Sequence, residues 1–145
     1  MGFNFSLATV LRVRGILEAQ EERMLQKILF EITQTREELA RTEAAIAGSD
    51  ASRRESVFKP LIGRHVHEFY GEVKELKQNK KDLEEKLEKL EQLRAKQVKI
   101  YEEARRNRKM LTNMREEKRS AYESDLARLE QKTLDDVFIS RRNRN

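Results

Sequence analysis

The feature that most constrains this chain is a row of apolar residues that repeats at steps of three and four in its second half. The first members of the row are Phe69, Val73, Leu76, Leu83, Leu87 and Leu90, and Lys80 interrupts it once. This spacing puts a narrow apolar stripe on one side of an α-helix, as in a coiled coil. The row resumes at Leu93, Ile100, Ala104, Leu111, Met114, Tyr122, Leu126 and Leu129. A helix of about 65 residues would be roughly 95 Å long, too long for the inside of a small globule. The rest of the chain must therefore cover its stripe.

The composition agrees with long helices that share a narrow seam. Charged residues make up 39% of the 145 residues and hydrophobic residues 37%. This balance is too polar for a compact globule, and the regular apolar spacing is not typical of disorder. Cysteine is absent, so the sequence predicts neither a disulfide framework nor thiolate chemistry. No run of 18 apolar residues occurs, and we therefore expect no membrane-spanning helix.

A second apolar row fills the first part of the chain. Ser6 is a candidate N-cap, and Phe5 could pack against Val10 as a hydrophobic staple. The row comprises Val10, Val13, Leu17, Met24, Ile28, Ile32, Leu39 and Ile46, and Gln20, Thr35 and Thr42 fill its polar gaps. Gly48 is a natural residue to end this helix, and Pro60 can begin the next one. We predict a helix over about 6–47, a turn region over about 48–62, a helix over about 63–138, and a frayed basic tail.

Two helices with one short connection predict an all-α fold. The expected architecture is a single domain over residues 1–145, a long antiparallel two-helix coiled-coil hairpin whose second helix overhangs the first. If residues near 46 face residues near 69, Val10 faces about residue 105. Residues beyond about 110 then lack a partner within the chain, although the apolar row continues there. An unpaired stripe of this kind indicates a partner, either a second copy or another protein.

The sequence offers little for catalysis or for a metal. Its five glycines are scattered and form no phosphate-binding loop. His65 and His67 are two residues apart, so they point to different faces of a helix, whereas a shared metal needs a spacing of four. Most carboxylates alternate with Lys or Arg on outward faces, and a two-helix hairpin provides no concave, desolvated site. We therefore predict no enzyme, no metal and no cofactor.

The net charge of +5 is concentrated in residues 104–145, which carry twelve basic and seven acidic side chains. The cluster Arg105, Arg106, Arg108 and Lys109 could bind phosphates. However, Glu116 and Glu117 follow it, and no nucleic-acid recognition motif is present. A nucleic-acid-binding hairpin is therefore a weaker alternative than an acidic protein partner or a solvated helix end.

The order of several short motifs resembles the FliJ family of flagellar export proteins. The opening FNFSLATVLRVRGILEAQEE is similar to the family's F-x-F-x-L-x-x-V-L-x-x-R start. The closing stretch resembles its Tyr followed by E-x-K-x-L-D-E and a basic tail, through Tyr122, Glu130, Lys132, Leu134 and Asp135. Asp136 replaces the usual Glu. The middle stretch HEFYGEVKELKQ resembles the start of the family's second helix, so the resemblance covers essentially the whole chain.

The resemblance implies a cytoplasmic, non-enzymatic stalk of the type III export apparatus, similar to the gamma subunit of rotary ATP synthases. Its implied partners are the export ATPase ring, the cytoplasmic domain of the membrane-embedded export gate, and export chaperones. Such a stalk is held peripherally at the inner face of the cell membrane. The expected gate-binding residues are Phe69, Val73 and Leu76, although their spacing by itself favours a place in the seam that faces the first helix. The expected ATPase-ring residues are Leu126, Arg128, Leu129, Arg141 and Arg142. A generic coiled-coil scaffold and a virulence-type secretion stalk remain alternatives.

Overall fold

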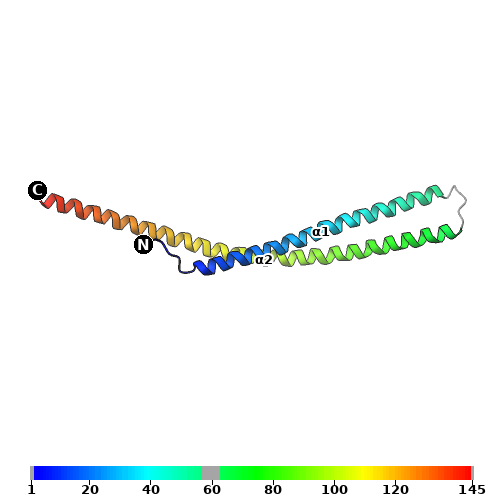
Figure 1. The fold of residues 1–145 in the computed structure, drawn as a ribbon, viewed down its shortest axis with the longest axis horizontal. Helices are drawn as coiled ribbons and strands as arrows, with labels where there is room; N and C mark the ends of the chain where they lie inside the picture. Colours follow the sequence, from blue (N-terminus) through cyan, green and yellow to red (C-terminus); the bar gives the residue numbers. More distant parts are fainter. Residues whose placement is uncertain (1, 57–62, 145) are drawn as a thin grey trace. The chain divides into compact units, whose positions relative to one another are not determined.

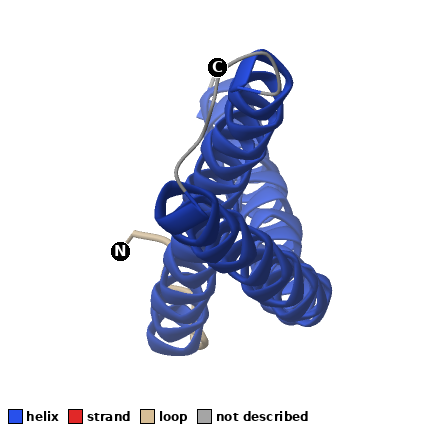
Figure 2. Cartoon of the chain, turned by 90° about the vertical axis from the view of Figure 1, so that its right-hand side faces the viewer, coloured by secondary structure: helices blue, strands red, loops and turns tan. Residues whose placement is uncertain are grey.

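The computed structural model describes residues 2–56 and 63–144, with side chains described for 2–55 and 67–144. Two helices account for nearly all of this part of the chain, α1 (Ala8–Ser56) and α2 (Gly63–Arg144), as Figure 1 shows. No strand occurs among the described residues, and Figure 2 shows helix apart from a short N-terminal loop. The two helices pack against each other. The predicted all-helical fold is confirmed.

Both helices are longer than the sequence predicts. α1 continues through Gly48 to Ser56, and no described glycine has a positive φ. A glycine inside a helix costs only about 1 kcal/mol relative to alanine, so Gly48 is tolerated and does not end α1. α2 extends through the tail that was expected to fray, and Arg141, Arg142 and Arg144 lie in its last turn. Their positive charges favour the carbonyl end of a helix. Pro60, the predicted start of the second helix, lies outside the described residues.

The contacts divide the chain into two compact units, and each contains one segment of α1 and one of α2. Unit 1 comprises Met1–Glu21 and Tyr101–Asn145, and unit 2 comprises Glu22–Ile100. In unit 2, Arg36 binds Glu91 and Lys80 lies near Glu43. Residue numbers therefore rise along one helix as they fall along the other, so the helix segments are antiparallel. The same holds in unit 1, where Phe3 contacts Tyr122 and Glu18 binds Arg108.

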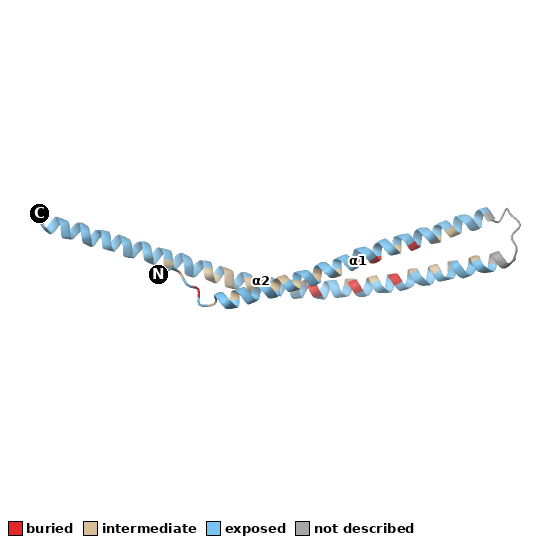
Figure 3. Cartoon of the chain, viewed as in Figure 1, coloured by how far each residue is buried: buried red, intermediate tan, exposed pale blue. Residues whose placement is uncertain are grey.

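The seam of unit 2 follows the predicted row from Ile28 to Ile46 on α1 and from Phe69 to Leu90 on α2, with polar residues among its buried positions. Met24, Leu93 and Ile100, which the sequence also places in the row, are instead 53%, 50% and 46% exposed. The buried positions of the seam are Ile32, Thr35 and Thr42 on α1 and Leu83, Leu90 and Gln97 on α2. In Figure 3 the buried positions are few among the exposed ones along α1 and α2. Thr35 is only 1% exposed, and its hydroxyl donates to the Glu31 carbonyl at 2.8 Å. The Thr42 hydroxyl donates to the Glu38 carbonyl at 2.9 Å. Because each hydroxyl is satisfied within its own helix, threonine can occupy the seam at little cost.

Lys80 interrupts the apolar row but not the packing. Its side chain is partly exposed, and its ammonium lies 3.8 Å from a Glu43 carboxylate oxygen and 4.0 Å from one of Glu84. The aliphatic stem can therefore stay in the row while the charge reaches carboxylates at the surface.

The seam of unit 1 differs from the predicted one. Val10, Val13 and Leu17, which the sequence places in the row, are 43%, 49% and 40% exposed. The half-buried positions are instead Leu7, Leu11, Gly15 and Glu18. The covered positions lie one or two residues beyond the predicted ones, and each residue turns the side chain by about 100° around the helix, so a different side of the helix packs. The predicted row is wrong for this segment.

The facing register is also shifted, because α1 is longer than expected. Glu18, not Val10, lies opposite this part of α2, where it binds Arg108. Beyond residue 110, Leu111 and Met114 are half-buried, and Tyr122 contacts Phe3. The prediction that residues beyond about 110 lack a partner within the chain is therefore wrong for the stretch up to Tyr122. From Glu123 to Arg144 every residue of α2 is exposed, as expected for an overhang.

Candidate interaction surfaces

The N-terminal arm, residues 2–7, packs on α2 within unit 1. Phe5 is 6% exposed, and the Lys118 ammonium lies 5.8 Å from its ring centroid. The rings of Phe3 and Tyr122 are 5.7 Å apart between centroids. Such aromatic and cation–π contacts stabilise the packing beyond the contribution of the buried apolar area. The interpretation of Phe5 as a staple on Val10 misses this role, and the two closely spaced phenylalanines, Phe3 and Phe5, are the signal in the sequence that could have indicated it.

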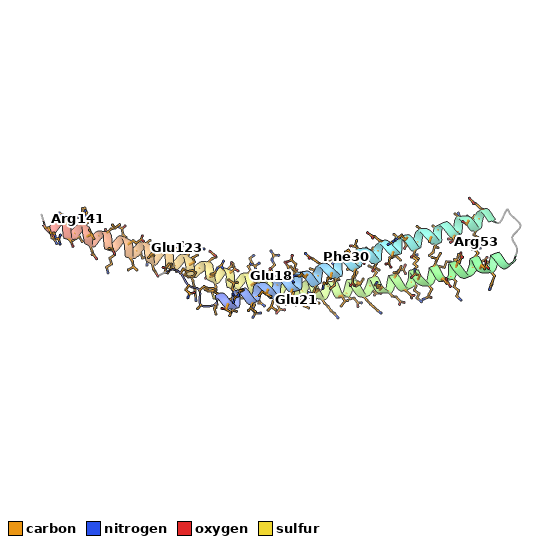
Figure 4. The ribbon with its side chains drawn as sticks, in the orientation of Figure 1. Glu18, Glu21, Phe30, Arg53, Glu123 and Arg141 are labelled. Carbon is orange, nitrogen blue, oxygen red and sulfur yellow. The ribbon has the colours of Figure 1, made fainter. Side chains whose placement is uncertain are left out.

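A charged pair fixes the register inside unit 1. The Arg108 guanidinium donates from Nε to Glu18 Oε2 at 2.6 Å and from Nη2 to Oε1 at 3.2 Å. The side chain of Glu18 is 15% exposed and that of Arg108 is 31% exposed; Figure 4 labels Glu18 on α1. The Arg108 hydrogen bond lowers the pKa of Glu18 despite partial burial, which alone would raise it, and the charges of Arg108 and Arg105 lower it further. This two-point contact orients both partners.

The same pair weakens the case for a phosphate-binding site. Of the four clustered cations, Arg108 is neutralised by Glu18, and the Arg106 Nε donates to the Glu102 carbonyl at 3.4 Å. Arg105, Arg106 and Lys109 are exposed. The cluster therefore presents less positive charge than the sequence indicates.

The C-terminal segment, residues 123–144, is an uncovered helical stretch that carries several large apolar side chains. All of its residues are exposed. Its large apolar side chains are between 43% and 70% exposed, and they are Leu126, Leu129, Leu134, Val137, Phe138 and Ile139. Apolar side chains gathered on an uncovered helix typically mark a binding surface. The predicted ATPase-ring residues Leu126, Arg128, Leu129, Arg141 and Arg142 therefore all lie on one exposed helical segment. Figure 4 labels Glu123 and Arg141 on this segment.

The predicted gate-binding residues lie in the packed row of unit 2. Phe69, Val73 and Leu76 are half-buried and share the heptad spacing of Leu83. The accessible aromatic beside them is Tyr70, which is 52% exposed. Its ring meets that of Phe69 edge-on at 6.2 Å between centroids, and the Arg53 guanidinium lies 5.7 Å above it. This environment favours the seam interpretation of the three residues, and gate binding stays a prediction.

A second exposed apolar stripe lies at the start of α1. Val10, Val13, Ile16 and Leu17 are between 40% and 51% exposed. The apolar spacing of the sequence places Val10, Val13 and Leu17 in the seam, so this exposed surface is not evident from the sequence. Periodicity alone finds the stripe but does not show which side of the helix is covered.

The described residues contain no group of three or more His, Cys, Asp and Glu that could hold a metal ion. His67 is exposed, and the side chain of His65 lies outside the described residues. Within the described part of the chain, neither helix contains a stretch that is apolar enough over a sufficient length to span a membrane. Comparison with known proteins gave no match to any family model, curated protein or solved structure.

Proposed function

We propose that this chain is a non-enzymatic coupling stalk of the bacterial flagellar type III protein export apparatus. In this role it links the export ATPase ring to the export gate and interacts with export chaperones. It works in the cytoplasm, held peripherally at the inner face of the cell membrane by the apparatus. The observation that carries the proposal is the C-terminal segment, which is helical and exposed and carries an apolar row with a basic end.

Two further observations support the proposal. The opening and closing motifs resemble those of the FliJ family in the expected order. The fold consists of two packed helices, as a stalk requires. A coupling stalk needs partner surfaces at separate places along the chain and no chemistry of its own. The C-terminal segment is one such place. The other is the part of unit 2 around Tyr70, which includes Phe69, Val73 and Leu76 and which we call the tip of unit 2.

The C-terminal segment is the proposed surface for the ATPase ring. Leu126 and Leu129 are apolar anchors, 43% and 62% exposed, and Arg128, Arg141 and Arg142 add positive charge along the same segment. Exposed apolar side chains contribute the most binding free energy when a partner buries them fully. Charges around them speed and orient the association of the two proteins. An acidic groove between ATPase subunits would match this combination.

The proposed gate contact involves the tip of unit 2. Since Phe69, Val73 and Leu76 are half-buried, a gate domain must bind their open edges or displace part of α1. Tyr70 offers an accessible ring beside them. The gate contact is therefore expected to be weaker than the ATPase contact.

Other functions fit the observations less well. A generic coiled-coil scaffold explains the fold but not the ordered motifs at both ends. A virulence-type secretion stalk shares the architecture and differs only in its partners. A nucleic-acid-binding hairpin is disfavoured, because Glu18 neutralises Arg108 inside the basic cluster.

The proposal can be tested by binding measurements on the purified full chain. Fluorescence anisotropy would be recorded with the flagellar export ATPase and the cytoplasmic gate domain of the same organism, and with tRNA and duplex DNA over a series of salt concentrations. We expect saturable binding to the ATPase and gate, and weak nucleic-acid binding that disappears as salt rises. Tight, salt-resistant binding to tRNA together with no ATPase binding would overturn the proposal.

A further inference from the structure

One row of side chains along the C-terminal segment has a spacing that is symmetric about its central residue, Thr133. The row consists of Leu126, Leu129, Thr133, Val137 and Ser140. Leu129 and Val137 are each four residues from Thr133, and Leu126 and Ser140 are each seven residues from it. All five side chains are exposed. An interface between identical copies related by a two-fold axis must be self-complementary, and such a mirrored row meets that requirement.

The middle of the row is suited to contact with its own copy. The Thr133 hydroxyl donates to the Leu129 carbonyl at 2.9 Å, so covering Thr133 would leave no unsatisfied donor. Its methyl group then remains available for packing. This is the arrangement that Thr35 and Thr42 already adopt in the buried seam of unit 2.

The charges that border the row lie on two separate flanks. Glu123 and Arg141 are 18 residues apart, which is about five turns at 3.6 residues per turn, so they lie on the same flank. Lys132 and Asp136 are four residues apart and share the other flank, together with Asp125. Each of these flanks therefore carries both signs of charge.

We propose that the C-terminal segment pairs with the same segment of a second copy of this chain, antiparallel and centred on Thr133. In this arrangement Leu129 packs on Val137 of the second copy, and Leu126 packs on its Ser140. The two Thr133 side chains meet on the two-fold axis. The pairing removes the exposed apolar row from water in both copies, which is the driving force.

Charge complementarity selects the antiparallel direction. A two-fold axis across an antiparallel helix pair places the same flank of both helices side by side. Glu123 then lies beside Arg141 of the second copy, and Lys132 beside its Asp136, each contact occurring twice. A parallel pairing brings opposite flanks together. It keeps an attraction between Glu130 and Lys132, but it sets Glu123 beside Asp125.

The contacts that these charged side chains make within their own helix are weak, so contacts with a second copy can replace them. Glu123 lies 3.4 Å from Arg119 on the same helix, and both side chains are more than half exposed. Exposed pairs of this kind contribute little. The row is short and contains three large aliphatic side chains, so the dimer should be in rapid equilibrium with the monomer.

The inference goes beyond the proposed function and does not depend on it. The ATPase ring and the second copy would cover the same face, so each would exclude the other. Because self-association is measured with the purified chain alone, its failure would not bear on ATPase binding, and a failure of ATPase binding would not bear on it.

Sedimentation velocity of the full chain over a hundredfold range of concentration tests the pairing. We expect reversible dimers, a dimer dissociation constant raised about tenfold by Glu123→Arg or by Arg141→Glu, and recovery when these two variants are mixed. Arg142→Glu makes the same charge change on the outward side and should leave the constant unchanged. Val13→Glu, on the stripe at the start of α1, should also leave it unchanged. A monomer at all concentrations would overturn the proposal. A dimer dissociation constant that the charge reversals leave unchanged would also overturn it.

Disulfide crosslinking tests the direction, since the chain contains no cysteine of its own. Thr133→Cys should crosslink to itself under mild oxidation. Leu126→Cys should not crosslink to itself but should crosslink to Ser140→Cys when the two variants are mixed. Self-crosslinking of Leu126→Cys would indicate a parallel dimer and contradict the proposed arrangement. Circular dichroism melts check that each variant keeps the fold.

Discussion

Removing the charge of Glu18 should destabilise unit 1 in a manner that depends on pH. The carboxylate receives two hydrogen bonds from Arg108, at 2.6 and 3.2 Å, and its side chain is 15% exposed. Fully exposed ion pairs contribute about 0.2–1 kcal/mol. Two-point geometry and partial burial strengthen this pair, while desolvation of the carboxylate opposes it. We expect a coupling free energy of about 1–1.5 kcal/mol between the two side chains at pH 7.

The pH dependence follows from the lowered pKa of Glu18. A carboxyl group whose pKa is lower in the folded chain stabilises the fold at pH values above its unfolded pKa, which is about 4.3 for Glu. That contribution is lost as the pH falls through the lower, folded-state pKa. The coupling should therefore be constant from pH 7 to about pH 5 and should decline below about pH 4.

A double-mutant cycle measures this coupling. Glu18→Gln, Arg108→Met and the double variant are unfolded in urea, and hydrogen exchange of amides in 8–21 and 101–115 reports opening of unit 1. Arg106→Met, a change at an exposed neighbouring arginine, is the matched control and should have little effect. A coupling below about 0.3 kcal/mol at pH 7, or an equal coupling at pH 3, would refute the reasoning.

Three further predictions concern helix continuity, the arm and the tip of unit 2. Gly48→Ala should stabilise the chain to urea by up to about 1 kcal/mol, since an added Cβ meets nothing within 4 Å; a loss would mean that α1 stops at Gly48. Phe5→Ala should cost about 2 kcal/mol, less than a core Phe, and speed hydrogen exchange around Lys118; unchanged exchange there would show that the arm is not packed. Phe69→Ala should lower the melting temperature because the ring is half-buried. An unchanged melt with lost gate affinity would instead identify a partner surface.

Much of the seam of unit 2 was predictable, because the side of each helix that carries the apolar row is there the side that the other helix covers. Ile32, Leu83 and Leu90 are buried as the heptad pattern predicts. The deep burial of Thr35 was less evident, since composition marks threonine as polar. Its hydroxyl is satisfied by the Glu31 carbonyl, so only the methyl group and the small volume matter at the seam.

The register of unit 1 could not be predicted from one helix at a time. Val10, Val13 and Leu17 form the more regular apolar row, and periodicity therefore selects them. The covered side is instead the one that lets Glu18 meet Arg108. That choice depends on where α1 ends, because each residue added before the turn shifts the facing pairs. The proposed partner-binding positions depend on which side chains are exposed, and the sequence alone does not reveal this.

The most direct test of the account is the affinity of the export ATPase ring for variants of the C-terminal segment. We predict that Leu126→Ser combined with Leu129→Ser weakens binding by about tenfold or more and leaves the melting temperature unchanged. Ile139→Ser removes an apolar side chain of similar size that is 55% exposed on the other side of the same segment, and it should bind like the unmodified chain. Equal affinity for all three chains, or no binding by the unmodified chain, would contradict the account.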